Sequence, residues 1–255
     1  MSVTLENVRL TGVAGREGPL FDGLSLHIGD NSRVGILGTK TSGTVPLLRL
    51  ICGTEAPEDG IIRREGRISW PIPLTSFIMN THTLARNVRF IARLYGIDDE
   101  NFPRRIAEIA ELTEFLNTPL SKCPKLVKPR LAYALGIGMD FDLYLFSGSF
   151  APADKPFKER AEEISGERTA GHGIVVATSV PAEVEKNCES VYVLEEGRAI
   201  YFADTGEGVE HFKQLLAMEK KKEKPGAGRS AEDEDEDEGL GDVDIIGAAV
   251  GGAVE

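Results

Sequence analysis

The sequence predicts an α/β fold with a largely parallel sheet at its centre, an antiparallel β portion near the N-terminus and a helical insert. Three observations carry this prediction. A buried apolar strand at 33–38 (RVGILG) leads through a short polar loop into an apolar helix that ends at Gly53. Short apolar runs then alternate with helical patterns, which is typical of parallel strands joined by crossover helices. A stretch from about 71 to 138 repeats its apolar residues at helical spacing.

The other elements follow in order along the chain. Residues 3–10 and 24–28 alternate apolar and polar side chains, as half-buried strands do, and 58–68 predict a hairpin. Apolar residues at helical spacing predict helices at 84–95, 102–116, 126–138, 155–165 and 208–222. The remaining β structure is predicted as strands at 142–146 and 173–179 and a hairpin at 191–202. We expect the strands at 33–38 and 142–146 to be parallel neighbours.

Charge is unevenly distributed along the chain. The net charge is −12, and the segment 225–255 holds ten acidic residues and one arginine, which leaves −3 for the remainder. A near-neutral body lacks the basic face of a nucleic-acid-binding protein, so we exclude a nucleic-acid partner. We therefore predict one folded domain over 1–222 and a disordered tail, acidic and rich in glycine and alanine, over 223–255.

The tail is expected to be dispensable for folding. Its seven consecutive acidic residues at 232–238 repel one another and bury no apolar surface. Deleting 225–255 should therefore leave the melting temperature nearly unchanged when thermal unfolding is followed by circular dichroism. A fall of more than a few degrees would mean that the tail packs on the body.

Signals for membrane insertion, secretion and metal binding are absent from the sequence. No run approaches the roughly 18 apolar residues of a membrane-spanning helix, and the N-terminus lacks the basic start and apolar core of a secretory signal. Cys52, Cys123 and Cys188 lie far apart and form no metal or redox motif. We therefore expect free thiols in a reducing cytoplasm, no metal centre, and membrane contact only through a partner.

Five stretches of the sequence together resemble one known family. They are VGILGTKTSGTVPLLRLICG, ISWPIPL, NVRFIARLYG, FDLYLF and VLEEGRAIYF. The family is the ATP-binding subunit of ABC transporters that export capsular polysaccharide, polysialic acid and similar polymers, and the resemblance covers about 3–215. It implies an ABC-type nucleotide-binding domain of the P-loop class, whose helical insert receives a short helix of a membrane permease.

The phosphate loop keeps its glycines and loses its charged chemistry. A P-loop needs two glycines at fixed spacing, then a lysine for the β- and γ-phosphates and a hydroxyl for Mg²⁺. Gly38 and Gly43 have this spacing. Thr44 stands in the place of the lysine, and Val45 stands in the place of the hydroxyl residue. We therefore predict a degenerate loop in which only Gly38, Gly43 and Thr44 could touch a nucleotide.

The other motifs that the resemblance implies are altered as well. The aspartate and glutamate that follow the Walker B strand would fall at Ser147 and Gly148. The switch histidine would fall at Ser179, and the glutamine that senses Mg²⁺ would fall near Met79. The signature motif aligns with a Pro-Lys-Leu triplet at 124–126, whose proline has no N–H to offer a phosphate.

These departures affect both faces that enclose ATP in the family. Asp154, which matches the D-loop aspartate, is retained, but alone it supplies no catalysis. Removing one transition-state charge contact commonly costs about 10²–10³ in rate, so several losses together should abolish turnover. The sequence therefore predicts a pseudo-ATPase with no catalytic residue, no metal site and no resident cofactor, in which binding of ATP and Mg²⁺ is strongly weakened.

The functional hypothesis is a binding module at the inner face of the cytoplasmic membrane. We predict that Trp70, Pro71, Arg89 and Arg93, all placed in the insert, contact a membrane permease. An intact ATPase sister subunit or a second copy of the chain is the expected further partner. Two alternatives stay open: a non-transport adaptor of envelope polysaccharide assembly recruited through its tail, and a working transport ATPase with unorthodox chemistry.

Overall fold

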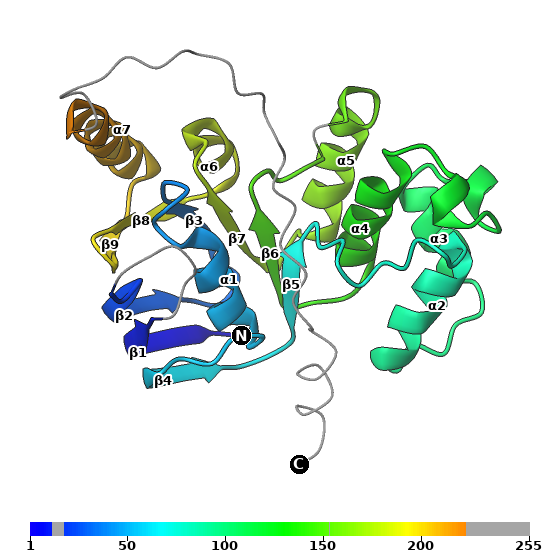
Figure 1. The fold of residues 1–255 in the computed structure, drawn as a ribbon, viewed down its shortest axis with the longest axis horizontal. Helices are drawn as coiled ribbons and strands as arrows, with labels where there is room; N and C mark the ends of the chain where they lie inside the picture. Colours follow the sequence, from blue (N-terminus) through cyan, green and yellow to red (C-terminus); the bar gives the residue numbers. More distant parts are fainter. Residues whose placement is uncertain (12–17, 153, 223–255) are drawn as a thin grey trace.

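The β structure of the protein is divided between two sheets. The computed structural model in Figure 1 describes residues 1–11, 18–152 and 154–222. The larger sheet has the order β5-β6-β7-β3-β8-β9, and the smaller has the order β2-β1-β4. The larger consists of β3 (Arg33–Leu37), β5 (Ile68–Ile72), β6 (Leu143–Ser147), β7 (Gly173–Thr178), β8 (Ser190–Glu195) and β9 (Arg198–Phe202). The smaller consists of β1 (Val3–Leu10), β2 (Phe21–Ile28) and β4 (Asp59–Arg64).

The central strands are parallel and the smaller sheet is antiparallel. β3 runs parallel to β7 and β8, β6 runs parallel to β5 and β7, and β9 closes the edge as the antiparallel partner of β8. β1 pairs with β2 and β4 in antiparallel fashion. The predicted α/β core, with its mixed sheet and its antiparallel β portion, is confirmed.

The expectation that the strands at 33–38 and 142–146 are neighbours was wrong. β7 lies between β3 and β6 and pairs with both. All six residues of β7 are buried, as expected of a strand with neighbours on both sides and covered faces. Because β3, β6 and β7 run in the same direction, their carboxyl ends still meet at one edge of the sheet.

The predicted hairpin at 58–68 was also wrong. β4 is mostly exposed and pairs with β1, whereas β5 is almost entirely buried and pairs with β6. Gly66, which has a φ of 81°, lies between them where the chain passes from one sheet to the other. A positive φ costs glycine little, so the turn forms here without bringing β4 and β5 into register.

The predicted helices follow the expected order with shifted ends, but the short helix at Pro181–Asn187 was not predicted. The helices are α1 (Thr44–Cys52), α2 (Leu84–Leu94), α3 (Phe102–Ile109), α4 (Val127–Gly138), α5 (Lys155–Arg168), α6 (Pro181–Asn187) and α7 (Thr205–Lys222). α3 is shorter than predicted, because Glu111 takes a φ of 55° and the Leu112 N–H donates to the Ala107 carbonyl, which ends the helix. Short 3₁₀ turns follow at Thr113–Phe115 and Leu120–Lys122. Within the described ranges, no helix has the length and apolar content needed to cross a membrane.

Two apolar clusters hold the elements together. α1 lies between the two sheets and buries Leu47, Leu48, Leu50 and Ile51 against β1, β2 and the larger sheet. The second cluster joins the other face of the larger sheet to α5, α6, α7 and the helices of 84–138. In Figure 1 those helices, α2 to α4, extend to one side of the molecule and α7 covers the opposite end. The tail predicted over 223–255 lies outside the described residues.

Candidate functional site

The loops after β3, β6 and β7 meet at the carboxyl edge of the larger sheet. The Gly38 N–H donates to the Thr178 carbonyl oxygen at 3.2 Å, and the Gly148 N–H donates to the Ala177 carbonyl oxygen at 2.8 Å. The loop after β3 is thereby joined to the end of β7, and so is the loop after β6. This edge carries the predicted positions Gly38, Gly43, Thr44, Val45, Ser147, Gly148 and Ser179.

Both glycines of the phosphate loop are required by the geometry. A Cβ atom added at Gly38 would lie 2.8 Å from Cγ2 of Thr44. Gly43 is the N-cap of α1 with a φ of 86°, and a Cβ there would lie 2.6 Å from a methyl carbon of Leu20. The strand, the tight loop and the helix therefore meet with little room for a side chain at these two positions, as the predicted phosphate loop requires.

The hydroxyls of this loop bond to one another. The Ser42 N–H donates to the Thr39 carbonyl at 3.1 Å, and the Thr39 N–H donates to Oγ of Ser42 at 3.0 Å. The hydroxyl of Thr39 lies 2.8 Å from that of Ser42 and 3.2 Å from that of Thr41. The Thr39 N–H, which could otherwise donate to an anion, therefore has a partner within the loop.

Charge compensation is sparse around this loop. Thr44 and Val45 open α1 and are half-buried, and neither is ionisable. Between positions 38 and 45 the sequence has a single cation, Lys40, which is exposed at the tip of the loop. For a ligand with several negative charges, such as a triphosphate, the loop offers only the N-terminal dipole of α1 and the charge of the exposed Lys40.

The end of β6 carries no carboxylate at the two predicted positions. Ser147 is half-buried, and Gly148 is exposed with a φ of 91°. Glu183 of α6, which sequence reasoning missed, reaches the same loop. One of its oxygens accepts from the Ser149 hydroxyl at 3.0 Å and the other from the Phe150 N–H at 3.1 Å. Because both oxygens are occupied by the loop, Glu183 holds the loop in place and is a poor candidate for a general base.

The switch position also lacks an ionisable group. Ser179 is exposed directly after β7, and its neighbour Val180 is 51% exposed. The Val180 N–H donates to Oγ1 of Thr178 at 3.0 Å. In the described part of the chain, no three His, Cys, Asp or Glu side chains are arranged to hold a metal ion.

Met79 lies in the loop between β5 and α2, and its backbone is fixed by Asn87. The Met79 N–H donates to Oδ1 of Asn87 at 2.8 Å, and Nδ2 of Asn87 donates to the Met79 carbonyl at 3.0 Å and the Thr83 carbonyl at 3.1 Å. Asn87 is buried, whereas the Met79 side chain is 41% exposed. The loop therefore has a defined shape and presents a thioether to solvent at the position predicted for glutamine.

The triplet at 124–126 precedes α4 without any capping side chain. Leu126, the N-cap residue, is 54% exposed, and α4 has no acidic residue in its first turn. Arg130, one turn further, forms an ion pair with Asp154 just before α5 and lies 4.7 Å from the ring centre of Phe157. Asp154 thus acts here as an anchor between α4 and α5.

Comparison with known proteins decides the family. No protein-family model matches the chain. The ATP-binding protein BexA of Haemophilus influenzae is 30% identical to it over 191 residues, which cover 75% of this chain and 88% of BexA. The capsule polysaccharide export ATP-binding protein CtrD of Neisseria meningitidis is 30% identical over 192 residues, covering 75% of this chain and 89% of CtrD. The chain belongs to the family of capsule export ATP-binding proteins.

Solved structures show that this capsule export family member has the fold of an ABC ATPase domain. An ATP-binding subunit of an ABC transporter superposes with a TM-score of 0.70 at 19% identity and covers 85% of this chain and 100% of that subunit. A dimeric ATP-binding cassette with bound ADP and phosphate superposes with a TM-score of 0.64 at 20% identity and covers 77% of this chain and 96% of that cassette. The family resemblance read from the sequence is confirmed.

The four predicted partner residues separate into two pairs. Trp70 and Pro71 were expected on the helical insert, but they belong to β5 and are buried. Trp70 packs edge-on against Phe77, Tyr95 and Phe141, with ring centres 5.3 to 5.5 Å apart. A buried aromatic in a central cluster stabilises the domain and offers no surface to a partner, so the placement of Trp70 and Pro71 was wrong.

Arg89 and Arg93 are exposed on α2, as the sequence indicated. Arg86 precedes them at helical spacing, so the three guanidinium groups share one face of the helix. None of the three has an ion-pair partner among the described residues. This capsule export family member therefore presents an arginine-lined face on α2, defined here as Arg86, Arg89 and Arg93.

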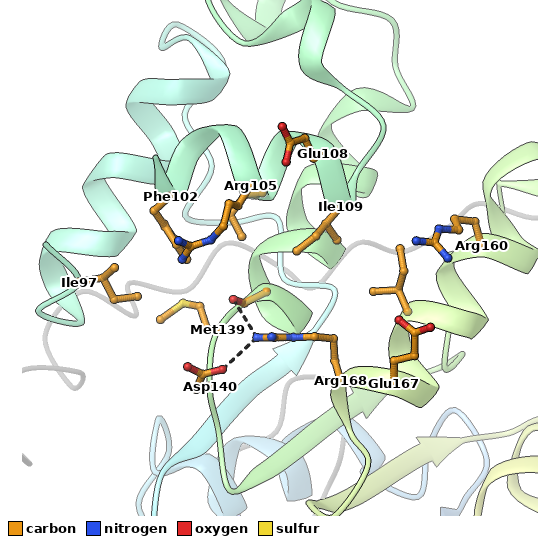
Figure 2. Close-up of a pocket in the computed structure, with 13 residues that line it drawn as sticks. Ile97, Phe102, Arg105, Glu108, Ile109, Met139, Asp140, Arg160, Glu167 and Arg168 are labelled. Carbon is orange, nitrogen blue, oxygen red and sulfur yellow. Dashed lines mark hydrogen bonds and ion pairs between the residues drawn. The ribbon is translucent and has the colours of Figure 1, made fainter. Parts of the chain in front are cut away.

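A cleft of about 570 Å³ opens at the opposite end of the sheet. Figure 2 shows that α3, the end of α4 and α5 surround it, with Arg168 reaching across to Asp140. Arg105, Arg160 and Glu167 line its rim around apolar side chains that include Met139. The end of α4 precedes the start of β6, so the cleft is remote from the phosphate loop and contains none of the predicted nucleotide positions.

Proposed function

We propose that this chain is a nucleotide-binding-domain subunit of an ABC-type capsular polysaccharide exporter that docks on a membrane permease and does not hydrolyse ATP. The observation that carries the proposal is the phosphate loop. A Cβ atom at either glycine would collide with a neighbouring side chain, yet the loop offers a threonine and a valine where triphosphate and Mg²⁺ need charge and coordination.

Loss of positive charge at the phosphate loop is the physical basis of this proposal. A phosphate-loop lysine and a bound Mg²⁺ offset most of the triphosphate charge, and their loss leaves the phosphates in mutual repulsion. Thr44 could add one neutral hydrogen bond, which is a small replacement. Ser147, Gly148 and Ser179 cannot hold the metal shell, polarise water or sense the γ-phosphate through an ionisable group. These losses at one sheet edge support a subunit that has kept its fold while losing its turnover.

Docking through the helical insert is the second part of the proposal. Proteins named for capsule export and for polysialic acid transport are similar to this chain over about three quarters of its length. The arginine-lined face of α2 has no intramolecular partner among the described residues, so its charge is available to carboxylates or carbonyl oxygens of another protein. We propose that this face meets a permease at the inner face of the cytoplasmic membrane.

The subunit would work beside another ATP-binding subunit. An intact sister would supply the chemistry, and this chain would act as the silent half of an asymmetric pair. A second copy of the chain is the alternative partner, and it would leave both composite sites without a lysine at position 44 and without an acidic residue at position 147. The proposed architecture remains a body over 1–222 with the acidic tail of 223–255.

Co-purification with a co-expressed permease tests the docking. The wild type should be retained by a tagged capsule-export permease, and the double variant Arg89→Glu with Arg93→Glu should lose retention by about tenfold or more, since about 1.4 kcal/mol corresponds to a factor of ten. Arg104→Glu on α3 is the matched control. Arg104 is exposed, and its one ion pair among the described residues is with Glu108 one turn away, so its reversal should leave retention nearly unchanged.

Two results would contradict docking at α2. One is failure of the folded wild type to co-purify with any permease of its own export system, which would favour an adaptor outside the transporter. The other is equal retention of the wild type and the double variant, with both shown to be folded by circular dichroism.

A further inference from the structure

Four lysines form a positively charged face beside the triplet at 124–126. Lys122, Lys125 and Lys128 surround the start of α4, and Lys155 is the first residue of α5. Lys122, Lys125 and Lys155 are exposed, and Lys128 is half-buried. The ion pair between Arg130 and Asp154 holds the start of α4 beside the start of α5, so the lysines flank one junction between the two helices. We call these four residues the lysine face.

The charge of the lysine face is uncompensated within the described residues. None of its four ammonium groups makes an ion pair or a side-chain hydrogen bond there, whereas Lys158 and Lys186 both pair with Glu162. Two carboxylates on adjoining elements, Glu111 and Asp154, are both bound by Arg130. The face therefore has four positive charges that are available to an anionic partner from elsewhere.

The direction of α7 shows where the acidic tail begins. Gly208 lies against Val191 at the start of β8, and His211 contacts Glu195 at the end of β8, with Nε2 and Oε2 2.9 Å apart. α7 therefore runs alongside β8 towards the carboxyl edge of the sheet and continues for eleven residues beyond His211, about 16 Å at 1.5 Å per residue. Figure 1 shows the end of α7 at the edge where the phosphate loop lies.

The chain beyond α7 is long enough to reach the lysine face. Residues 223–231 connect Lys222 to the acidic run and can span about 30 Å when extended. The run itself, 232–238, has seven consecutive carboxylates and can span about 24 Å more. Its charge is opposite to that of the lysine face, and α7 ends at the same edge of the sheet at which α5 begins.

We propose that the acidic segment 232–238 of the same chain binds across the lysine face. Each exposed carboxylate–ammonium contact is weak, but the tether holds many carboxylates close to four lysines at high effective concentration. The contact needs no folding of the segment, so it is compatible with a melting temperature that hardly changes on deletion of the tail. It also means that an anionic partner at this face, such as the phosphates of a nucleotide held by a sister subunit, must displace the tail.

Zero-length carbodiimide cross-linking of the full chain, followed by mass spectrometry, tests this proposal. The reagent joins a carboxylate to a lysine amine as an amide. At about 0.01 M ionic strength, where the Debye length is about 30 Å, cross-links from 232–238 to the lysine face should outnumber those to Lys213 several-fold. Lys213 is exposed on α7 and lies much nearer to the start of the tail. Its cross-links therefore measure the contacts that arise only because the tail is attached to α7. At about 1 M salt, where the Debye length is about 3 Å, the preference should disappear.

A charge variant and an isotope mixture complete the experiment. Conversion of all seven acidic residues of 232–238 to their amides should raise the acetylation rate of the lysine face several-fold, whereas Asp242→Asn with Asp244→Asn should leave it unchanged. Cross-links that favour Lys213, or that persist at high salt, would overturn the proposal. In an equal mixture of light and heavy chains, cross-links that join one chain to another would overturn it in favour of a second copy as the occupant.

Discussion

Phosphate release by the purified chain is expected to stay at background in the presence of ATP and Mg²⁺. In the proposed pseudo-ATPase, Thr44 and Val45 stand where groups that neutralise the triphosphate are expected, and Ser147, Gly148 and Ser179 stand where groups that hold Mg²⁺ and activate water are expected. Loss of one such contact commonly lowers a rate by about 10²–10³, so combined losses should remove all useful turnover. A steady-state phosphate-release assay, with CtrD measured alongside as a reference, provides the comparison.

Gly43 supplies the control for that assay. Because a Cβ at Gly43 would lie 2.6 Å from Leu20, Gly43→Val must distort the loop and abolish any chemistry that depends on it. Turnover of even about 0.1 s⁻¹ in the wild type, low against typical enzymes, that disappears in Gly43→Val would refute the pseudo-ATPase account. Turnover that Gly43→Val leaves unchanged would identify a contaminating ATPase.

Replacing Arg130 by alanine is expected to lower the free energy of unfolding by about 3–5 kcal/mol. The side chain of Asp154 is 4% exposed and that of Arg130 is 16% exposed, so the variant leaves a buried carboxylate without its counter-charge. It also removes the contact of the guanidinium with the Phe157 ring. Urea unfolding followed by fluorescence measures the change, with the exposed Lys125→Ala as a control within about 0.5 kcal/mol of wild type.

Replacing both members of the ion pair distinguishes the attraction between the two charges from the cost of burying one charge alone. Arg130→Met with Asp154→Leu removes both charges and should regain most of the lost stability, because buried ion pairs are often replaceable by apolar side chains of similar volume. A loss of less than about 1 kcal/mol in Arg130→Ala would show that the ion pair is solvated and does not anchor α4 to α5.

The local elements could be predicted because their signals are local. The apolar run of β3, the tight loop and the amphipathic α1 appear in consecutive residues, and so does the β8–β9 hairpin around Glu196 and Gly197. Strand order could not be predicted in this way. β7 lies between β3 and β6 because of long-range pairing that no single segment encodes. For the same reason β4 pairs with β1 and not with β5, which follows it in the sequence.

The residues that gather at the candidate site could be predicted from the sequence, whereas the side chains that hold its loops in place could not. The glycine spacing and the neighbouring strands indicated which residues would gather at the sheet edge. Asn87 and Glu183 hold two of the loops through contacts across 8 and 34 residues, and periodicity carries no signal for such bonds. Trp70 was misplaced because an apolar aromatic beside a proline reads equally well as a surface anchor or as part of a buried cluster.

Direct titration of the chain with Mg²⁺ and ATP tests the central claim, that the phosphate loop retains its shape without the charge to hold a triphosphate. We expect no saturable binding of ATP below about 1 mM, which corresponds to a binding free energy weaker than about −4 kcal/mol. We also expect that Thr44→Lys with Val45→Thr strengthens binding, since the backbone of the loop is already in place. Saturable, Mg²⁺-dependent binding by the wild type at micromolar ATP, lost in Gly43→Val, would contradict the claim.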